Sequence, residues 1–197
     1  MTEIVNQEPE KKLQTKNTVN PWLEVAQTLG TAIILSFGIR TFVAEARYIP
    51  SASMIPTLEI NDRLIIEKIS YRFQEPQRGD VVVFKPTARL IEQNYKGAAF
   101  IKRIIGLPGD KIEVKGGRVY VDDRPLQEKY IAEEPQYDYG PVTVPEDSYL
   151  VLGDNRNNSY DSHSWGFVPR QKLIGKAFVR FWPLNRVGSL DEKPLYQ

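Results

Sequence analysis

The sequence predicts a mainly β domain that follows a single apolar helix near the N-terminus. Three observations carry this prediction. One uncharged stretch lies close to the start of the chain, short apolar runs rich in β-branched residues recur from about residue 46 onwards, and helical periodicity is scarce after residue 50. A length of 197 residues suits one domain with an appendage, and we expect its sheets to be mostly antiparallel.

The first 45 residues divide into a tail and an apolar segment. Residues 1–20 are polar and mixed in charge, which predicts a flexible tail. Fifteen uncharged residues lie between Glu24 and Arg40, and as a helix they span about 22 Å. Extension to Ala44, with the Arg40 side chain reaching the interface, gives the roughly 20 residues that a membrane span needs. We therefore predict a transmembrane anchor over residues 21–45.

Two alternatives to an anchor are a buried core helix and a signal peptide that is cut off. A cleaved signal carries a basic region directly before the apolar run and a small-residue cut site after it. Here the preceding tail is long and nearly neutral, and no A-x-A sequence follows Ala44. These features favour an uncleaved anchor, and the tail lysines Lys11, Lys12 and Lys16 slightly favour a cytoplasmic N-terminus.

The remaining chain, residues 46–197, carries the predicted strands. Gly116-Gly117, between two alternating runs, is a strong hairpin signal. Residues 122–146 are rich in charge, proline and tyrosine, and we expect them to form an excursion outside the core sheet. The predicted strands cover residues 64–69, 81–84, 100–105, 112–114, 119–121, 149–152 and 178–182.

Composition excludes several functional classes. The 26 Lys and Arg residues nearly balance 25 Asp and Glu residues, so the chain lacks the basic excess of a nucleic-acid binder. There is no cysteine and only one histidine, which excludes Cys/His zinc sites, cysteine nucleophiles and disulfides. We expect neither a metal nor another cofactor.

Two segments carry residues suited to nucleophilic chemistry. In the first, Ser51 and Ser53 lie among apolar residues between Pro50 and Pro56, whose rings restrain the backbone. In the second, strand alternation places Lys102 opposite its two neighbours on an apolar face, where an amine releases its proton more easily and can serve as a general base. The alternatives are an ordinary capped turn for the serines and a lysine that faces water.

A third segment, residues 153–169, is crowded with short hydrogen-bonding side chains after a predicted strand. It contains His163, the only histidine, two positions after Asp161. With one of several serines, these two residues would complete a Ser-His-Asp triad. The alternative is a structural histidine paired with Asp161.

In this order and at this spacing, five segments resemble the conserved blocks of the bacterial type I signal peptidases, also called leader peptidases. The last segment also resembles the cyanobacterial and plastid branch of that family. The five segments are PSASMIPTL, RLIIEKISYRF, RGDVVVFKP, FIKRIIGLPGDKIEV and GDNRNNSYDSHSWGFVP.

The resemblance implies a role for each residue that matches a family position. Ser53 matches the nucleophile and Lys102 the general base of a Ser/Lys dyad. Ser51 matches the hydroxyl that joins the Ser53 amide in the oxyanion hole. Ser159 matches a serine that orients the lysine amine, and Asp161 matches an acid that supports the surrounding loop.

The same resemblance implies a substrate site and contains one departure. Ile49, Pro50 and Ile101 match positions that line the family's pockets for small substrate side chains. His163 stands where the family commonly has arginine, so its pair with Asp161 is expected to be weaker and sensitive to pH. This departure affects the support of the loop and not the dyad.

The implied protein is a membrane-anchored serine endopeptidase with coiled antiparallel sheets. It cleaves signal peptides from preproteins after small residues, at A-x-A sites. The family implies one span in the plasma membrane, with the N-terminus in the cytoplasm and the catalytic domain on the outer, periplasmic side; a thylakoid membrane is the alternative. Its partners are signal peptides and the lipid bilayer, without nucleic acid or metal. The rival interpretations are a self-cleaving repressor, a Ser-His-Asp hydrolase that uses His163, and an inactive, membrane-tethered β module.

Overall fold

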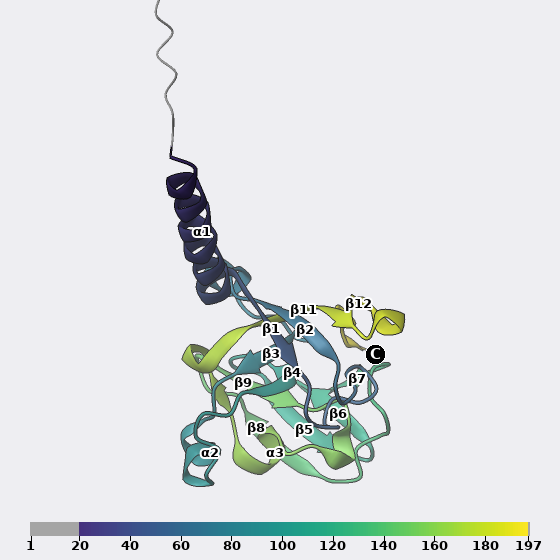
Figure 1. Cartoon of the computed structure of the whole chain (residues 1–197). Coiled ribbons are helices and arrows are strands. Elements are labelled where there is room, and N and C mark those ends of the chain that lie inside the picture. Colours follow the sequence, from purple (N-terminus) through teal and green to yellow (C-terminus); the bar gives the residue numbers. More distant parts are fainter. Residues whose placement is uncertain (1–19, 197) are drawn as a thin grey trace, which may run out of the picture. The chain divides into compact units, whose positions relative to one another are not determined.

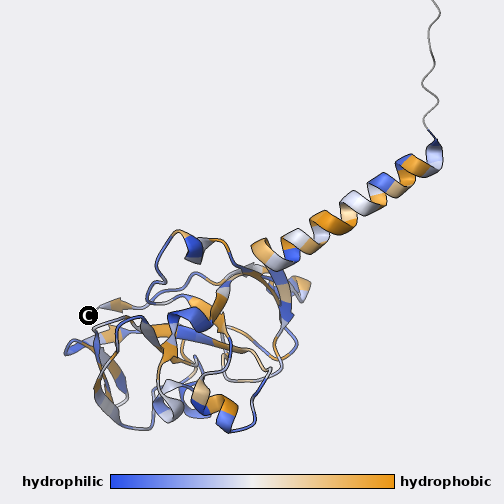
Figure 2. Ribbon diagram, turned by 90° about the vertical axis from the view of Figure 1, so that its left-hand side faces the viewer, coloured by the Kyte–Doolittle hydropathy of each residue, from blue (hydrophilic) through white to orange (hydrophobic). Residues whose placement is uncertain are grey.

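The computed structural model describes residues 20–196, in two units that divide after Phe37. The predicted tail, residues 1–20, lies outside the described residues except for Asn20. The first described element is helix α1, Pro21–Gly38, which begins at a proline that has no N–H to donate, as suits a first helical turn. None of its residues is buried, and in Figure 2 it is mainly white and orange.

Helix α1 continues into a short π-helical segment, η1 (Ile39–Val43), before strand β1 begins at Ala44. Pro21–Val43 together is long and apolar enough to cross a membrane. The apolar helix is therefore present where the sequence predicted it. It ends two residues before the predicted boundary at 45, because Ala44 and Glu45 already pair with β2 (Arg63–Glu67).

The larger of two sheets has eight strands, and all its pairs are antiparallel. The strand order is β1-β2-β11-β3-β4-β9-β10, with β12 beside β11 (Figure 1). Strand β4 therefore lies in the interior of the sheet, between β3 and β9. The strands are β1 (Ala44–Tyr48), β2 (Arg63–Glu67), β3 (Val81–Phe84), β4 (Phe100–Gly106), β9 (Ser148–Leu152), β10 (Val168–Pro169), β11 (Leu173–Trp182) and β12 (Gly188–Ser189).

The second sheet has five strands, again antiparallel, in the order β13-β7-β6-β5-β8. The predicted hairpin is confirmed: β5 and β6 are joined by Gly116 and Gly117, whose φ angles of 55° and 76° suit a two-residue turn that favours glycine. The strands are β5 (Lys111–Lys115), β6 (Arg118–Val121), β7 (Arg124–Gln127), β8 (Tyr139–Thr143) and β13 (Leu195–Tyr196).

Residues 122–146 lie outside the eight-stranded sheet but inside the folded core. They supply β7 and β8 to the second sheet, and Leu126, Tyr130 and Val144 are buried. The expected excursion is therefore part of the second sheet. Strand β7 has one buried residue, Leu126, and β8 has none, so neither strand carries the apolar alternation by which a strand is predicted from sequence.

Three apolar clusters fill the unit, and β4 contributes to all of them. Ile101 and Ile104 pack into two different clusters, as expected for residues on opposite faces of a strand. The fold class predicted from the sequence, a mainly β domain of antiparallel sheets after an apolar helix, is confirmed. The short helices are η2 (Ser70–Arg72), α2 (Ala88–Glu92), η3 (Arg156–Asn158), α3 (Ser162–Trp165), η4 (Arg170–Lys172) and η5 (Leu184–Arg186).

Candidate active site

Ser53 lies in a closed loop between β1 and β2. The Ile49 N–H donates to the Asp62 carbonyl oxygen (2.9 Å), which closes the base of the loop. Within the loop, the Leu58 N–H donates to the Met54 carbonyl oxygen (2.8 Å), and both of these side chains are fully buried. The buried neighbour at position 54 and the local hydrogen bonds therefore hold Ser53 in a defined position.

The loop that follows β9 fastens the Ser53 segment from the other side. Asn155 donates its backbone N–H to the Ser53 carbonyl oxygen and its side-chain amide to the Ala52 carbonyl oxygen, both at 3.1 Å. A Cβ atom on Gly153 would collide with the Ser53 carbonyl oxygen and with the Ser159 hydroxyl. Glycine at 153 is what allows the two segments to approach this closely.

The Lys102 Nζ atom donates a hydrogen bond to Ser53 Oγ at 2.5 Å. Both residues are buried, with exposures of 4% and 8%. Burial lowers the pKa of the Lys102 amine to about 8, although the carboxylates of Asp161 and Asp154 oppose the shift. The structure thus brings together a hydroxyl and an amine that becomes neutral at mildly alkaline pH.

Ser51 and Ser159 lie near this pair without hydrogen-bonding to the amine. Ser51 is exposed, and its Oγ lies 3.4 Å from Ser53 Oγ. The Ser159 Oγ is buried and has no hydrogen-bond partner among the described residues. The Ser159 Oγ lies close to Gly153, but no hydrogen bond joins it to the Lys102 amine.

Asp161 is fully buried and caps the loop. Its Oδ2 accepts the Gly153 N–H at 2.9 Å, while its Oδ1 lies 2.7 Å from His163 Nδ1 and accepts the His163 backbone N–H at 3.3 Å. The His163 ring stacks on Tyr137, with 4.4 Å between ring centroids. Within the described chain the His163 ring bonds to Asp161 and to no serine, which fits a structural histidine better than a triad base.

Sequence reasoning missed a buried ion pair that lies next to the candidate dyad in sequence. Arg103 is fully buried and binds Asp154 in a bidentate manner, at 2.9 and 2.7 Å. Its guanidinium also lies over the Tyr130 ring, 3.9 Å from the centroid. The available signal was a second cation in an apolar strand, and the structure buries both cations on opposite faces of β4.

A second buried pair was also missed. Arg156 donates to both carboxylate oxygens of Glu128 at 2.7 Å, and Tyr130 donates to the same carboxylate at 2.6 Å. Arg156 additionally donates to the Gly153 carbonyl oxygen at 3.1 Å. Residues 122–146 therefore support the loop that carries Asp161.

The three predicted substrate-binding residues line one cavity. Ile49, Pro50 and Ile101 border a cavity of about 240 Å³ whose wall also includes Val83 and Phe100. Its lining is predominantly apolar, apart from Arg47 and Tyr48 at the β1 side. The lining suits apolar side chains.

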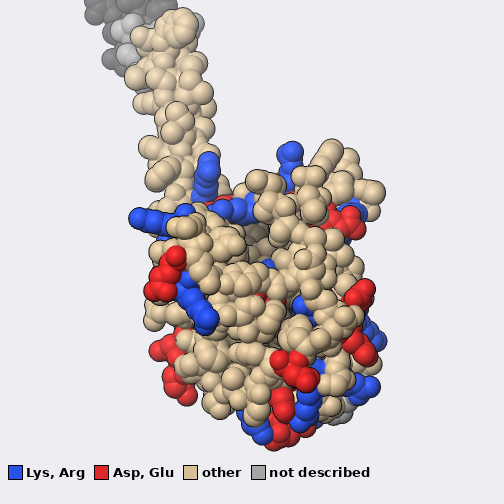
Figure 3. Space-filling model, turned by 90° about the horizontal axis from the view of Figure 1, so that it is seen from below, with Lys and Arg blue, Asp and Glu red and all other residues tan. Residues whose placement is uncertain are grey.

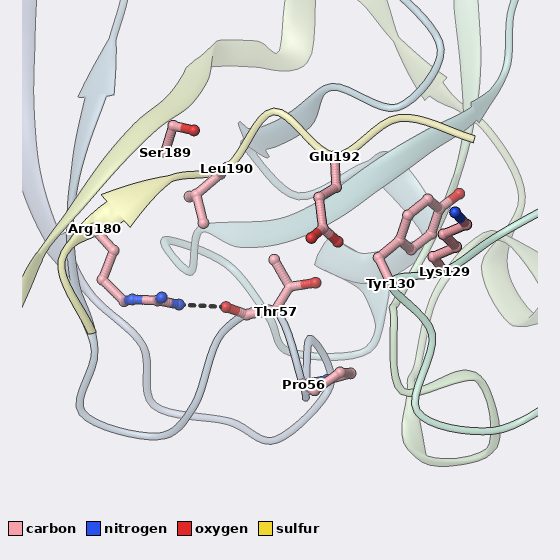
Figure 4. A pocket seen from close by; sticks show the side chains of 8 residues that line it. All are labelled: Pro56, Thr57, Lys129, Tyr130, Arg180, Ser189, Leu190 and Glu192. Atoms are coloured by element: carbon pink, nitrogen blue, oxygen red, sulfur yellow. Dashed lines mark hydrogen bonds between the residues drawn. The ribbon is translucent and has the colours of Figure 1, made fainter. Parts of the chain in front are cut away.

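A separate cavity of about 330 Å³, shown in Figure 4, contains none of the predicted site residues. Its Arg180 side chain donates to the Thr57 carbonyl oxygen at 2.6 Å.

Figure 3 shows a face on which acidic and basic side chains are interspersed. Among the described residues, no three His, Asp or Glu side chains are grouped so as to hold a metal ion.

A buried amine hydrogen-bonded to a serine hydroxyl, in a β-rich fold, suits activation of the hydroxyl as a nucleophile, as in a serine hydrolase. Residues 22–182 match the family described as signal peptidase, peptidase S26. The chain belongs to this family and is a serine peptidase of the signal peptidase I type.

Three relatives illustrate this membership. The protein "Probable signal peptidase I-2" of Synechocystis is 64% identical over 98% of this chain and 87% of its own length. "Signal peptidase I" of Leptolyngbya laminosa is 61% identical over 90% of this chain and 88% of its own. "Thylakoidal processing peptidase 1, chloroplastic" of Arabidopsis thaliana is 40% identical over 84% of this chain and 50% of its own. The similarity to the cyanobacterial and plastid branch is thereby confirmed.

Proposed function

We propose that Ser53 and Lys102 form the catalytic dyad of this peptidase. The observation that carries the proposal is the 2.5 Å hydrogen bond between the Lys102 amine and Ser53 Oγ, in residues that are both largely buried. In its neutral form the amine accepts the hydroxyl proton while Ser53 Oγ attacks the scissile carbonyl carbon. The protonated amine then donates to the leaving nitrogen, and the acyl-enzyme is hydrolysed by water that the same amine activates.

The oxyanion of the tetrahedral intermediate requires donors near Ser53 Oγ. Ser51 Oγ, 3.4 Å from that atom and exposed, is free to rotate its hydroxyl toward a bound substrate. Together with the Ser53 backbone N–H, it would supply two donors to the developing charge. We assign Ser159 to orienting the amine when substrate is bound, and Asp161 to supporting the loop.

The proposed substrate is an extended signal-peptide segment with small side chains at alternate positions. An extended peptide presents every second side chain to the same surface. The cavity bordered by Ile49, Pro50 and Ile101 is predominantly apolar, so it favours apolar side chains over polar ones. This supports cleavage after A-x-A sequences.

We propose that the apolar helix anchors the enzyme in a membrane by a single span. Pro21–Val43 has the length and composition that this requires, and its described residues are almost all exposed. The proposed orientation has the N-terminus in the cytoplasm and the catalytic domain on the outer side of the plasma membrane. The thylakoidal relative makes the thylakoid membrane the alternative location.

Cleavage of a preprotein whose signal ends in A-x-A tests the dyad. The full chain in detergent would be compared with Ser53→Ala and Lys102→Ala, and with the matched controls Ser189→Ala and Lys111→Ala on exposed positions of β12 and β5. We expect only the first two variants to lose cleavage. A fully active Lys102→Ala variant would contradict the dyad, and inactivity of well-folded wild type would favour the non-catalytic β module.

A further inference from the structure

A third cavity, of about 440 Å³, lies at the start of the second unit and is bordered by η1, β1, η2 and η4. None of the proposed catalytic residues lines it. Leu173 and Ile174 contribute apolar surface, and Tyr71 and Gln171 contribute polar surface. Five cationic side chains and one carboxylate also line it: Arg47, Lys68, Arg72, Lys85, Arg170 and Glu45.

The carboxylates near this basic cavity leave part of its charge unbalanced. Glu45 pairs with Arg47 at 2.6 Å and with Lys68 at 2.7 Å. A second carboxylate, from Glu75, pairs with Arg170 at 2.9 Å. The five lining cations therefore have two carboxylates as ion-pair partners, of which only Glu45 lines the cavity, and the wall retains an excess of positive charge.

Arg72 and Lys85 supply the unpaired part of this charge. Both side chains are exposed, and neither has a carboxylate within 4.0 Å in the part of the chain that the structure describes. The Arg72 guanidinium lies over the Phe42 ring, 5.7 Å from its centroid, so it faces η1. An anion that enters the cavity would meet two cations that have no competing carboxylate.

The basic cavity also reaches the end of the proposed membrane span. Thr41 of η1 forms part of its wall, and the candidate span ends at Val43. The Lys68 amine donates to the Arg40 carbonyl oxygen at 3.0 Å, which ties the cavity wall to the last turn of the span. The last residues of a span lie at the level of lipid headgroups, so the cavity would open among them.

We propose that the basic cavity binds the phosphate group of an anionic membrane lipid, with Arg72 and Lys85 as its principal contacts. The inference rests on the proposed membrane anchoring. Charge complementarity favours an anion, because basic clusters beside a membrane span attract anionic headgroups. The adjoining Leu173 and Ile174 side chains favour a phosphate that carries an apolar lipid over free phosphate.

Lipid retention by the full chain in neutral detergent tests the site. Phosphatidylglycerol and phosphatidylcholine would be titrated in competition, and the bound lipid counted by native mass spectrometry. We expect wild type to retain one phosphatidylglycerol about tenfold or more in preference to phosphatidylcholine, and Arg72→Gln/Lys85→Gln to lose that preference. Arg72→Lys/Lys85→Arg, which keeps both charges, should retain it.

The matched control is Lys111→Gln/Lys115→Gln, which removes two exposed cations from β5 in the other sheet. This variant should keep the wild-type preference. An equal loss in the control, or no loss in Arg72→Gln/Lys85→Gln, would overturn the proposed site. Complete displacement of the lipid by soluble glycerol phosphate would also overturn it, in favour of a site for a soluble anion.

Failure of the lipid site and failure of the proposed function are separable. The preference is measured in detergent, whereas flotation of the same chain with phosphatidylcholine vesicles tests the anchor. Cleavage of a short A-x-A peptide in detergent tests the dyad. Arg72→Gln/Lys85→Gln should float and cleave as wild type does, because neither residue contacts the proposed dyad, and the contact of Arg72 with Phe42 lies in the last turn of the span.

Discussion

The amine of Lys102 lies 2.5 Å from the hydroxyl of Ser53, although 49 positions separate the two residues in the chain. Lys102 comes from an interior strand of the larger sheet, and Ser53 comes from the loop between β1 and β2. The contact is formed out of bulk water, where a charged amine is costly. Burial of the Lys102 amine at this contact should therefore affect both the stability of the fold and the pH dependence of cleavage.

The first prediction is that Lys102→Met stabilises the fold at neutral pH. Because the folded-state pKa of the amine is about 8 and its ordinary value is 10.5, the unfolded chain binds more protons between these values. Wild-type stability therefore rises as pH increases through this interval and is lowest below it. We expect Lys102→Met to gain about 1–3 kcal/mol in free energy of unfolding at pH 7, with the gain shrinking between pH 8 and 10.5.

Urea unfolding of the full chain in detergent, followed at several pH values, measures this difference. Lys111→Met is the control, because its amine is partly exposed and pairs with Asp123 on the surface. The control should change stability by less than about 1 kcal/mol at every pH. A Lys102→Met variant that is less stable than wild type at pH 7 would contradict the desolvation argument.

The second prediction separates the catalytic from the structural role of Ser159. Its buried hydroxyl has no partner among the described residues, so Ser159→Ala should leave stability within about 1 kcal/mol of wild type or increase it. If the hydroxyl orients the Lys102 amine in the substrate complex, kcat should fall about tenfold or more while KM changes little. Peptide cleavage kinetics measure both constants, and an unchanged kcat would remove Ser159 from the site.

The third prediction concerns the buried pair of Arg103 and Asp154. Arg103→Met would leave the Asp154 carboxylate buried without its cation, at a cost of about 3–5 kcal/mol in stability. Arg170→Met is the matched control, because its partner Glu75 is largely exposed, and it should cost less than about 1 kcal/mol. Denaturant midpoints measure the stability of both variants. Equal losses of stability would contradict the argument that burial makes the Arg103–Asp154 pair costly to break.

The fourth prediction is that His163→Ala retains most of its cleavage activity. The change removes one of the donors to the Asp161 carboxylate, while the N–H groups of Gly153 and of residue 163 remain. We expect a stability loss of about 1–3 kcal/mol. A rate as low as that of Ser53→Ala would instead favour the Ser-His-Asp interpretation.

Local patterns in the sequence predicted the parts of the fold that depend on local physics. The Gly116-Gly117 turn and the alternation around Lys102 required only backbone preferences and a period of two. The same alternation also predicted that Lys102 and Arg103 lie on opposite faces. Two prolines and apolar neighbours pointed to the segment that holds Ser51 and Ser53, and only the family resemblance selected Ser53 as the nucleophile.

Partners distant in the chain could not be predicted in the same way. Nothing near Arg103 indicates that its carboxylate comes from Asp154, 51 positions later, or that Glu128 pairs with Arg156. The first pair depends on the pairing of β4 with β9 and the second on how the two sheets meet, and no periodicity encodes either. The part that segment 122–146 plays in the second sheet could not be predicted for the same reason, because its strands gain their partners from that sheet.

The dyad is tested most directly by the pH dependence of kcat/KM for an A-x-A peptide. With wild type, we expect the rate to increase tenfold per pH unit on the acidic side and to level off near pH 8, where the Lys102 amine becomes neutral. Ser53→Ala and Lys102→Ala should show no such activity at any pH. A wild-type rate that levels off near pH 6, or a Lys102→Ala variant that keeps the wild-type profile, would contradict the account.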